Sequence, residues 1–284
     1  MPKLSLTRGN KFNSRKNIMA LIIMIIVTAI FLYPFFIMLF VSLKSAREAL
    51  LSPNTFPRDI RPENYLNAWK IMKFHQPFFN SVLVTATGVG GVVVAGGMAA
   101  FILAKSKSRI AVPLYFFFVA GIMIPFYTSL IPIVKIMTNL GLTDSRIGLA
   151  IAYAGRAMPM GLFMFYGFIK GTPDSIIESA VIDGAGKWKT YWSIVFPLMR
   201  PITTTVIILK VLWFWNDFLF PMLMLTTPGK RTIPLTQYYF SGEYGTQWEL
   251  AFASYIIAML PVLILYIFGQ KNIISGISAG AVKG

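Results

Sequence analysis

Residues 18–43 read IMALIIMIIVTAIFLYPFFIMLFVSL, and these 26 positions hold no charged side chain. The hydrocarbon core of a bilayer is about 30 Å thick, and roughly 20 apolar helical residues cross it. Basic residues precede the stretch, as they do in a secretory signal. The apolar core of such a signal is only about 7–15 residues long, however. We therefore expect an uncleaved membrane-spanning helix at 18–43.

Further apolar stretches of similar length follow along the chain. They cover residues 78–104, 111–134, 147–169, 202–226 and 251–268. Pro113, Pro125 and Pro132 are expected to kink or end the helix at 111–134, because proline lacks an amide hydrogen. The chain is 56% hydrophobic and only 13% charged, whereas soluble domains carry about 25% charged residues. The sequence thus predicts an all-α integral membrane protein with about six transmembrane helices in a single domain, 1–284.

Composition also excludes several classes of function. The net charge of +16 would raise the question of nucleic acid in a soluble chain. Here the basic residues lie between apolar spans, where they anchor helices and meet anionic lipid. The chain has no cysteine and one histidine, and its acidic residues are scattered. We therefore expect no catalytic site, no metal site and no nucleic-acid partner.

The distribution of basic residues predicts the orientation in the membrane. With the N-terminus in the cytoplasm, 14 basic residues fall in inside segments, 10 in outside loops and 2 within spans. The short basic clusters beside the span ends, which carry most topological weight, favour the same orientation. Both termini are therefore expected to be cytoplasmic.

The second span is rich in small residues. Small side chains let helix backbones approach closely, which is how helices associate in lipid. This face is expected to pack against another helix, either in this chain or in a partner subunit. The residues concerned are Gly88, Gly90, Gly91, Ala95, Gly96, Gly97, Ala99 and Ala100.

The segment between the fourth and fifth spans, 170–201, reads KGTPDSIIESAVIDGAGKWKTYWSIVFPLMRP. Thr172 or Asp174 can cap the start of a helix, and Gly184 offers a stop. The apolar residues between them are spaced three and four apart, as on one face of a helix. The sequence predicts a short amphipathic helix at the cytoplasmic surface, which would dock against either lipid headgroups or a partner protein.

This segment resembles the E-A-A, three residues, G, nine residues, I-x-L-P motif of the membrane subunits of binding-protein-dependent ABC importers. Its extended form in carbohydrate importers, E-A-A-x-x-D-G-A-x-x-W, is also matched, with Ser179 and Phe196 as departures. Three further elements resemble the same branch: the P-x-N-Y element at 62–65, the W-N-D-F segment at 215–218, and the tail at 275–284, which is similar to that of the second maltose-importer membrane subunit. The matching residues of the motif are Glu178, Ala180, Asp183, Gly184, Ala185, Trp188, Ile194 and Pro197.

The resemblance implies a type I importer fold in the plasma membrane of a prokaryote. The short helix would be a coupling helix, seated in a groove of a cytoplasmic ATPase. It implies these partners: a second homologous permease subunit, two ATPase subunits that bind ATP and Mg²⁺, and an extracytoplasmic binding protein that delivers a sugar or oligosaccharide. No cofactor would be bound by this chain. The residues expected to couple to the ATPase are Glu178, Ser179, Ala180, Asp183, Gly184 and Ala185.

Three ionisable residues, Arg156, Lys210 and Asp217, are expected at membrane depth, where an unpaired charge costs several kcal/mol. Lys210 and Asp217 are seven apart and would share a helix face. One hypothesis is that Trp215, Asn216 and Asp217 line a solute path, since an aromatic ring with amide and carboxylate acceptors suits sugar hydroxyls. The alternative is an internal salt bridge of Asp217 with Arg156 or Lys210.

Two rival functions remain open at this level. A self-contained secondary carrier usually has internal repeats and ion-coupling groups at the midplane, and the chain has no visible repeat. A membrane-embedded enzyme needs clustered carboxylates, histidines or cysteines. There is also no G-x-x-x-x-G-K-[ST] phosphate loop, so ATP hydrolysis would have to come from another chain.

Overall fold

The computed structural model describes residues 14–242 and 245–281, and it is helical apart from one short hairpin. Strands β1 (Ser241–Gly242) and β2 (Gly245–Thr246) pair antiparallel. Lys3, Arg8 and Lys11, and the last tail residues, 282–284, lie outside the described residues. The all-α membrane architecture predicted from sequence is confirmed. Among the described helices, four are long and apolar enough to cross a bilayer, or up to six if two bent pairs each count as a span.

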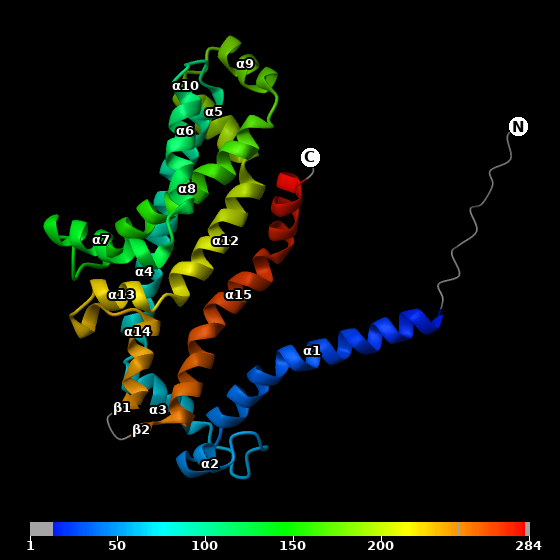
Figure 1. The fold of residues 1–284 in the computed structure, drawn as a ribbon, viewed down its shortest axis with the longest axis vertical. Coiled ribbons are helices and arrows are strands. Elements are labelled where there is room, and N and C mark those ends of the chain that lie inside the picture. The colour runs from blue at the N-terminus through cyan, green and yellow to red at the C-terminus, as the bar shows by residue number, and fades with distance from the viewer. Residues whose placement is uncertain (1–13, 243–244, 282–284) are drawn as a thin grey trace, which may run out of the picture.

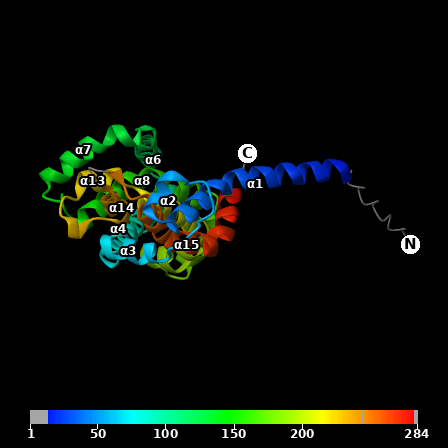
Figure 2. The same ribbon diagram turned by 90° about the horizontal axis from the view of Figure 1, so that it is seen from below.

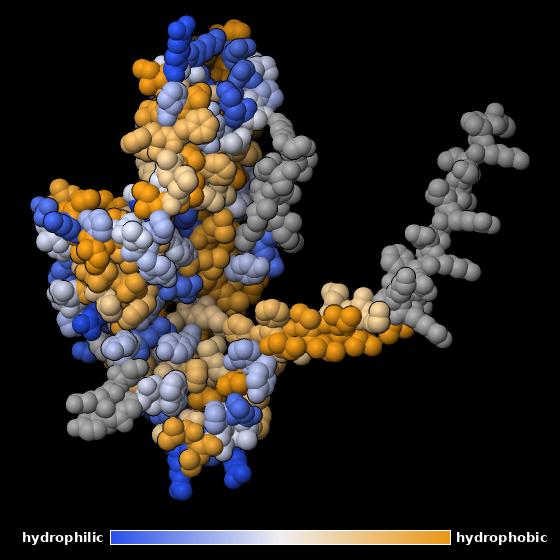
Figure 3. Space-filling view, viewed as in Figure 1, coloured by the Kyte–Doolittle hydropathy of each residue, from blue (hydrophilic) through white to orange (hydrophobic). Residues whose placement is uncertain are grey.

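Helix α1 (Ser14–Ser42) leaves the rest of the molecule and projects away from it (Figures 1 and 2). Every side chain from 18 to 36 is exposed, and they form a continuous hydrophobic surface (Figure 3). Only the end of α1 is buried, beside α15 (Trp248–Ala281). A surface of this kind is stable in lipid or against another chain, and not in water.

The P-x-N-Y element fixes the end of α1 through hydrogen bonds. It lies at the start of α3 (Glu63–Met72), after the short helix α2 (Ala46–Leu51). The buried Asn64 Nδ2 donates to the carbonyl oxygens of Ser42 (2.9 Å) and Lys44 (2.8 Å). The hydroxyl groups of Tyr65 and Ser42 are 2.8 Å apart. These bonds satisfy carbonyl groups that a helix end leaves without an intrahelical partner.

The core forms where a long helical segment crosses α8 (Arg146–Lys170). This segment consists of α4 (His75–Gly91), the π-helical turn η1 (Val92–Gly96) and α5 (Gly97–Lys105). A Cβ added at Gly91 would lie 3.0 Å from the Cβ of Ala154, and one at Gly96 would lie 3.2 Å from the Sδ of Met158. The small-residue face therefore packs within this chain, although a Cβ at Gly90 would meet nothing within 4 Å.

Two of the expected spans are interrupted. Residues 111–134 form α6 (Ala111–Ala120), the 3₁₀ turn η2 (Gly121–Met123) and α7 (Phe126–Asn139), with a bend of 107° between the two halves. Of the three prolines expected to disturb this stretch, Pro125 lies at the break, while Pro113 and Pro132 lie inside helices.

The expected span 202–226 ends early. Helix α12 (Arg200–Asn216) stops ten residues before the expected end, and α13 (Leu219–Met224) follows after a break. Before α12 the chain runs through α10 (Lys187–Thr190), the π-helical turn η3 (Tyr191–Val195) and α11 (Phe196–Leu198), and it bends by 75° into α12. The short elements η4 (Pro228–Lys230), α14 (Ile233–Gln237) and η5 (Tyr238–Phe240) lead to the hairpin.

The two ends of the helix bundle carry different structures. Helices α9 (Asp174–Ile182) and α10 lie at one end, at the top of Figure 1. Helices α2 and α3 and the hairpin lie at the other end (Figure 1). The motif segment and the loops at the opposite end are therefore separated by the whole length of the membrane helices.

The close packing of α8 on η1 yields a first prediction. A Cβ added at Gly161 would lie 2.5 Å from Cγ1 of the buried Val92, whereas a Cβ at Gly155 of the same helix would meet nothing within 4 Å. We expect Gly161→Ala to destabilise the protein by about 1–3 kcal/mol through overpacking. Gly155→Ala should be neutral or stabilise it by up to about 1 kcal/mol. Thermal unfolding of the purified chain in detergent measures both, and equal unfolding midpoints would contradict this packing.

Candidate functional site

The start of α9 is held by a lysine rather than by a side-chain cap. Pro173 occupies the N-cap position, so the expectation that Thr172 or Asp174 caps the helix is wrong. Asp174 is the first helical residue, and its carboxylate accepts from Lys105 Nζ at 2.6 Å. The same Nζ donates to the carbonyl of Thr172 at 2.8 Å. The hydrogen bond from Lys105 and its charge lower the pKa of Asp174. Lys105, at the end of α5, thus fixes the segment that enters α9.

The end of α9 confirms that Gly184 stops the helix. Gly184 has φ +78°, a left-handed conformation that costs other residues roughly 1–2 kcal/mol. Its amide donates to the carbonyl of Val181 (3.0 Å), and the Ala185 amide donates to the carbonyl of Ala180 (2.9 Å). This pair of bonds is the Schellman arrangement, which requires glycine or a similar residue at this position. The motif residues Ala180, Gly184 and Ala185 therefore have a local structural role.

The outer face of α9 presents a carboxylate beside two apolar side chains. Glu178 is exposed, Val181 is 60% exposed and Ile182 is 85% exposed. Ser179 and Asp183 are also exposed, whereas Ala180 is buried within this chain. A helix of nine residues is too short to be stable alone in water. The exposed face of α9 is a surface that its own chain leaves uncovered.

At membrane depth, Asp217 caps a helix instead of pairing with a cation. Helix α12 ends at Asn216, and Asp217 is extended, with φ −75° and ψ 126°. Its Oδ1 accepts from the amides of Leu219 (3.1 Å) and Phe220 (3.4 Å). Its Oδ2 accepts from the Tyr153 hydroxyl at 2.7 Å.

The expected salt bridge of Asp217 is wrong. None of the ion pairs found among the described residues joins it to Arg156 or Lys210. The shared helix face with Lys210 is wrong as well, because the helix ends before Asp217.

One face of α8 donates hydrogen bonds to both breaks in the neighbouring helices. Tyr153 donates to Asp217 at the break between α12 and α13. Arg156, three residues further along α8, donates from Nη2 to the carbonyl of Ile124 at 2.8 Å, at the break between α6 and α7. Residues three apart lie on the same side of a helix. Irregular backbone at membrane depth thus receives its hydrogen bonds from within the protein.

An open pocket of about 490 Å³ lies between these two breaks. Asn216 and Asp217 line this pocket, and Trp215 does not. Trp215 is buried, donates from Nε1 to the carbonyl of Ala258 (3.1 Å) and meets Phe78 edge-on. The tryptophan in the wall is Trp213, which the sequence analysis missed. Trp213 and Asn216 are three residues apart in α12 and so lie on one helix face, and this spacing could have identified Trp213.

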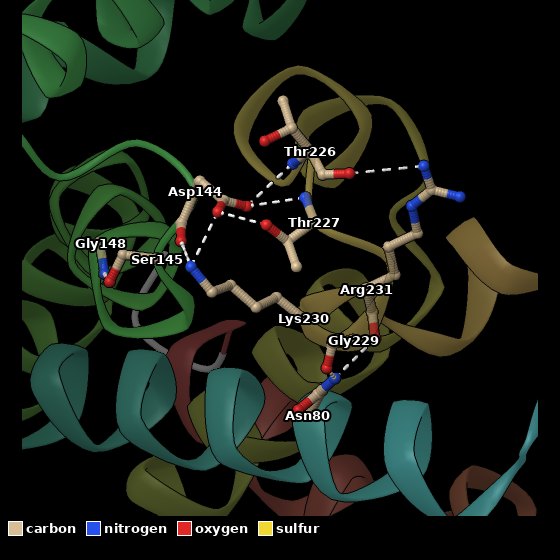
Figure 4. Close-up of polar contacts among 9 residues, drawn as sticks. All are labelled: Asn80, Asp144, Ser145, Gly148, Thr226, Thr227, Gly229, Lys230 and Arg231. Carbon is tan, nitrogen blue, oxygen red and sulfur yellow. Dashed lines mark hydrogen bonds and ion pairs between the residues drawn. The ribbon is translucent and has the colours of Figure 1, made fainter.

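The loop after α13 is joined to its neighbours by a polar cluster, which we call the loop latch: Asn80, Asp144, Thr227 and Lys230 (Figure 4). Asp144 accepts from Lys230 Nζ (2.7 Å), from the Thr227 hydroxyl (2.7 Å) and from the Thr227 amide (2.9 Å). The bond from Lys230 and those from Thr227 lower the pKa of Asp144 far below its usual value. Asn80 Nδ2 donates to the carbonyls of Gly229 (3.0 Å) and Arg231 (2.9 Å). The latch therefore fixes the loop after α13 to α4 and to the turn before α8.

Residues 92–278 match the family model described as the inner membrane component of binding-protein-dependent transport systems. The chain belongs to this family. Among its relatives, the probable starch degradation products transport system permease of Thermoanaerobacterium thermosulfurigenes is 34% identical, over 91% of this chain and 94% of the relative. A multiple sugar-binding transport system permease of Streptococcus mutans is 38% identical, over 89% and 92%.

The fold of this permease is similar to that of a solved membrane transporter. A chain of a bacterial ABC transporter involved in the import of the acidic polysaccharide alginate superposes with a TM-score of 0.81 at 21% identity, covering 95% of this chain and 99% of the other. The family model and the two relatives confirm the resemblance to membrane subunits of carbohydrate ABC importers. The permease is a multi-pass membrane protein, and its relatives are named as transport subunits, not enzymes.

The helix cap at Asp217 yields a second prediction. Asp217→Ala removes the acceptor for two amides and should destabilise the permease by about 1–2 kcal/mol. Asp217→Asn keeps an acceptor oxygen and should destabilise the permease much less than Asp217→Ala does. Thermal unfolding in detergent measures both, with Lys210→Met as the control. If Asn were as damaging as Ala, and Lys210→Met equally so, Asp217 would be acting as an ion-pair partner instead.

Proposed function

We propose that this permease is the membrane-spanning subunit of an ATP-driven importer, coupled to separate ATPase subunits through α9. The observation that carries the proposal is the exposed face of α9, which combines Glu178 with Val181 and Ile182 at one end of the molecule. Exposed apolar side chains beside a carboxylate, on a segment fixed at both ends, form a surface suited to a protein partner.

In this proposal Glu178 makes the acidic contact to the ATPase, with Ser179 and Asp183 beside it. Ala180, Gly184 and Ala185 act indirectly, since they shape the helix end that presents this face. Two ATPase subunits bind ATP and Mg²⁺, and the permease carries no cofactor. Motion of the ATPases would reach the membrane helices through Lys105, which joins α9 to α5.

A second, homologous permease subunit is the partner that we propose for α1. Helices associate in lipid by packing against one another, yet α1 extends away from its own bundle (Figures 1 and 2). Docking on a second subunit would cover the apolar surface at 18–36. The solute path would then lie between the two subunits.

We propose the pocket between the helix breaks as part of that path. Trp213 offers an aromatic face to a sugar ring, and Asn216 and Asp217 offer polar groups to hydroxyls. The buried Trp215 would support the wall without touching solute. The two relatives are named for starch degradation products and for multiple sugars, which supports a sugar or an oligosaccharide as the solute.

The orientation follows from the same assignment. The end that carries α9 would face the cytoplasm together with both termini, in the plasma membrane of a prokaryote. The loop latch and the loops at the opposite end would face an extracytoplasmic binding protein. An ATPase at one end and a solute donor at the other give transport a direction.

The proposal predicts the effect of reversing one charge. Glu178→Lys should insert and fold normally, but recovery of the ATPase with the purified permease should fall about tenfold or more, the effect of roughly 1.4 kcal/mol at the contact. Glu63→Lys, an exposed glutamate at the opposite end, is the matched control and should leave recovery unchanged. Undiminished recovery with Glu178→Lys would refute the role of α9.

A further inference from the structure

Two cations, Arg156 and Lys210, lie near the middle of two helices that begin at opposite ends of the molecule. Arg156 lies ten residues into α8, and Lys210 lies ten residues into α12. At 1.5 Å per residue, each is about 15 Å from the start of its helix. That depth is about half of a hydrocarbon core of about 30 Å. Since α8 and α12 pack against each other, both charges lie near mid-membrane.

Both cations lie against the aromatic wall of the pocket. The guanidinium of Arg156 is 5.9 Å from the ring centre of Phe126, and Lys210 Nζ is 5.6 Å from that of Trp213. The two rings meet edge-on with their centres 5.0 Å apart, and both line the pocket that contains Asn216 and Asp217. The cations therefore contact two rings of one wall of the proposed path, although neither is among the residues that line the pocket.

Neither cation has an anionic partner in the part of the chain that the structure describes. None of the ion pairs found there involves Arg156 or Lys210. Asp217, the carboxylate in the pocket wall, already accepts from Tyr153 and from two amides. Arg156 donates to a carbonyl, but its buried Nε has no partner.

An uncompensated pair of charges at membrane depth is costly, and such residues mark solute or ion pathways. This cost falls when an anion or water enters the site. Arg offers planar paired donors that match a carboxylate, phosphate or sulfonate, and Lys adds a compact charge. The aromatic faces next to them suit the apolar face of a sugar ring.

We infer that Arg156 and Lys210 form an anion subsite in the solute path, so that the permease carries saccharides bearing a carboxylate or a comparable oxyanion. This rests on the proposed function. The rival is a carboxylate from the second permease subunit, which would neutralise the same two cations in the assembled importer.

The absence of cysteine from this chain allows a direct test on the complete importer. Tyr127→Cys places one thiol in the pocket wall, at a position that is 73% exposed. Its reaction rate is measured with an anionic sulfonatoethyl and a cationic trimethylammonium-ethyl methanethiosulfonate, with and without trapped ATP. The ratio of the two rates is divided by the ratio for a free small thiol.

A cationic pocket concentrates anions by about tenfold or more, so the anionic reagent should be favoured by that factor. Lys210→Gln and Arg156→Gln should each reduce the preference several-fold, and Lys210→Arg should keep it. A normalised ratio near one with both cations intact would overturn the inference and favour a partner carboxylate. So would a thiol that neither reagent reaches in either state.

A second arm tests the solute chemistry on the same importer. D-Galacturonate should slow the reaction of the thiol with neutral methyl methanethiosulfonate several-fold more than D-galactose at equal concentration. Equal protection by the two sugars would overturn the inference. Failure of the proposed function is distinguishable, because it shows in the recovery of the ATPase with Glu178→Lys and not in these rates.

Discussion

Lipid offers no hydrogen bonds, so every interruption of a helix at membrane depth must be satisfied by the protein itself. In this permease one face of α8 meets that requirement at two places, through Tyr153 to Asp217 and through Arg156 to Ile124. The two breaks stand on either side of the same pocket. These bonds stabilise both interruptions and, with them, the wall of the pocket.

The close fit of α8 against α4, η1 and α5 gives this face its fixed position. Glycines allow the approach, and the buried aromatic rings of Tyr153 and Phe214 stack with their centres 4.4 Å apart. Helix α5 then continues to Lys105, which holds the start of α9. A single packed unit therefore connects the pocket in the membrane to the exposed face of α9. In the proposed function, this unit carries the motion of the ATPases to the solute path.

The apolar spans and the motif segment could be predicted from the sequence because length, charge and glycine placement act locally. Gly184 is an example, since its left-handed conformation needs no distant residue. The capping role of Asp217 could not be predicted. The inference from its seven-residue spacing from Lys210 requires a continuous helix, and the helix ends at Asn216. Neither proline nor glycine lies between 210 and 217 to signal the break. The burial of Lys44 could not be predicted from the sequence either, because its partners Pro53 and Thr55 come close only when the loop is folded.

The claim on which the account depends is that α9 faces the cytoplasm and contacts an ATPase. Ile182→Cys, in a chain with no other cysteine, places one thiol at the most exposed large apolar residue of that helix. We expect this thiol to cross-link to the ATPase subunit in intact membranes, and to be protected from an impermeant reagent added outside the cell. Labelling from outside, or cross-links to lipid alone, would contradict the account.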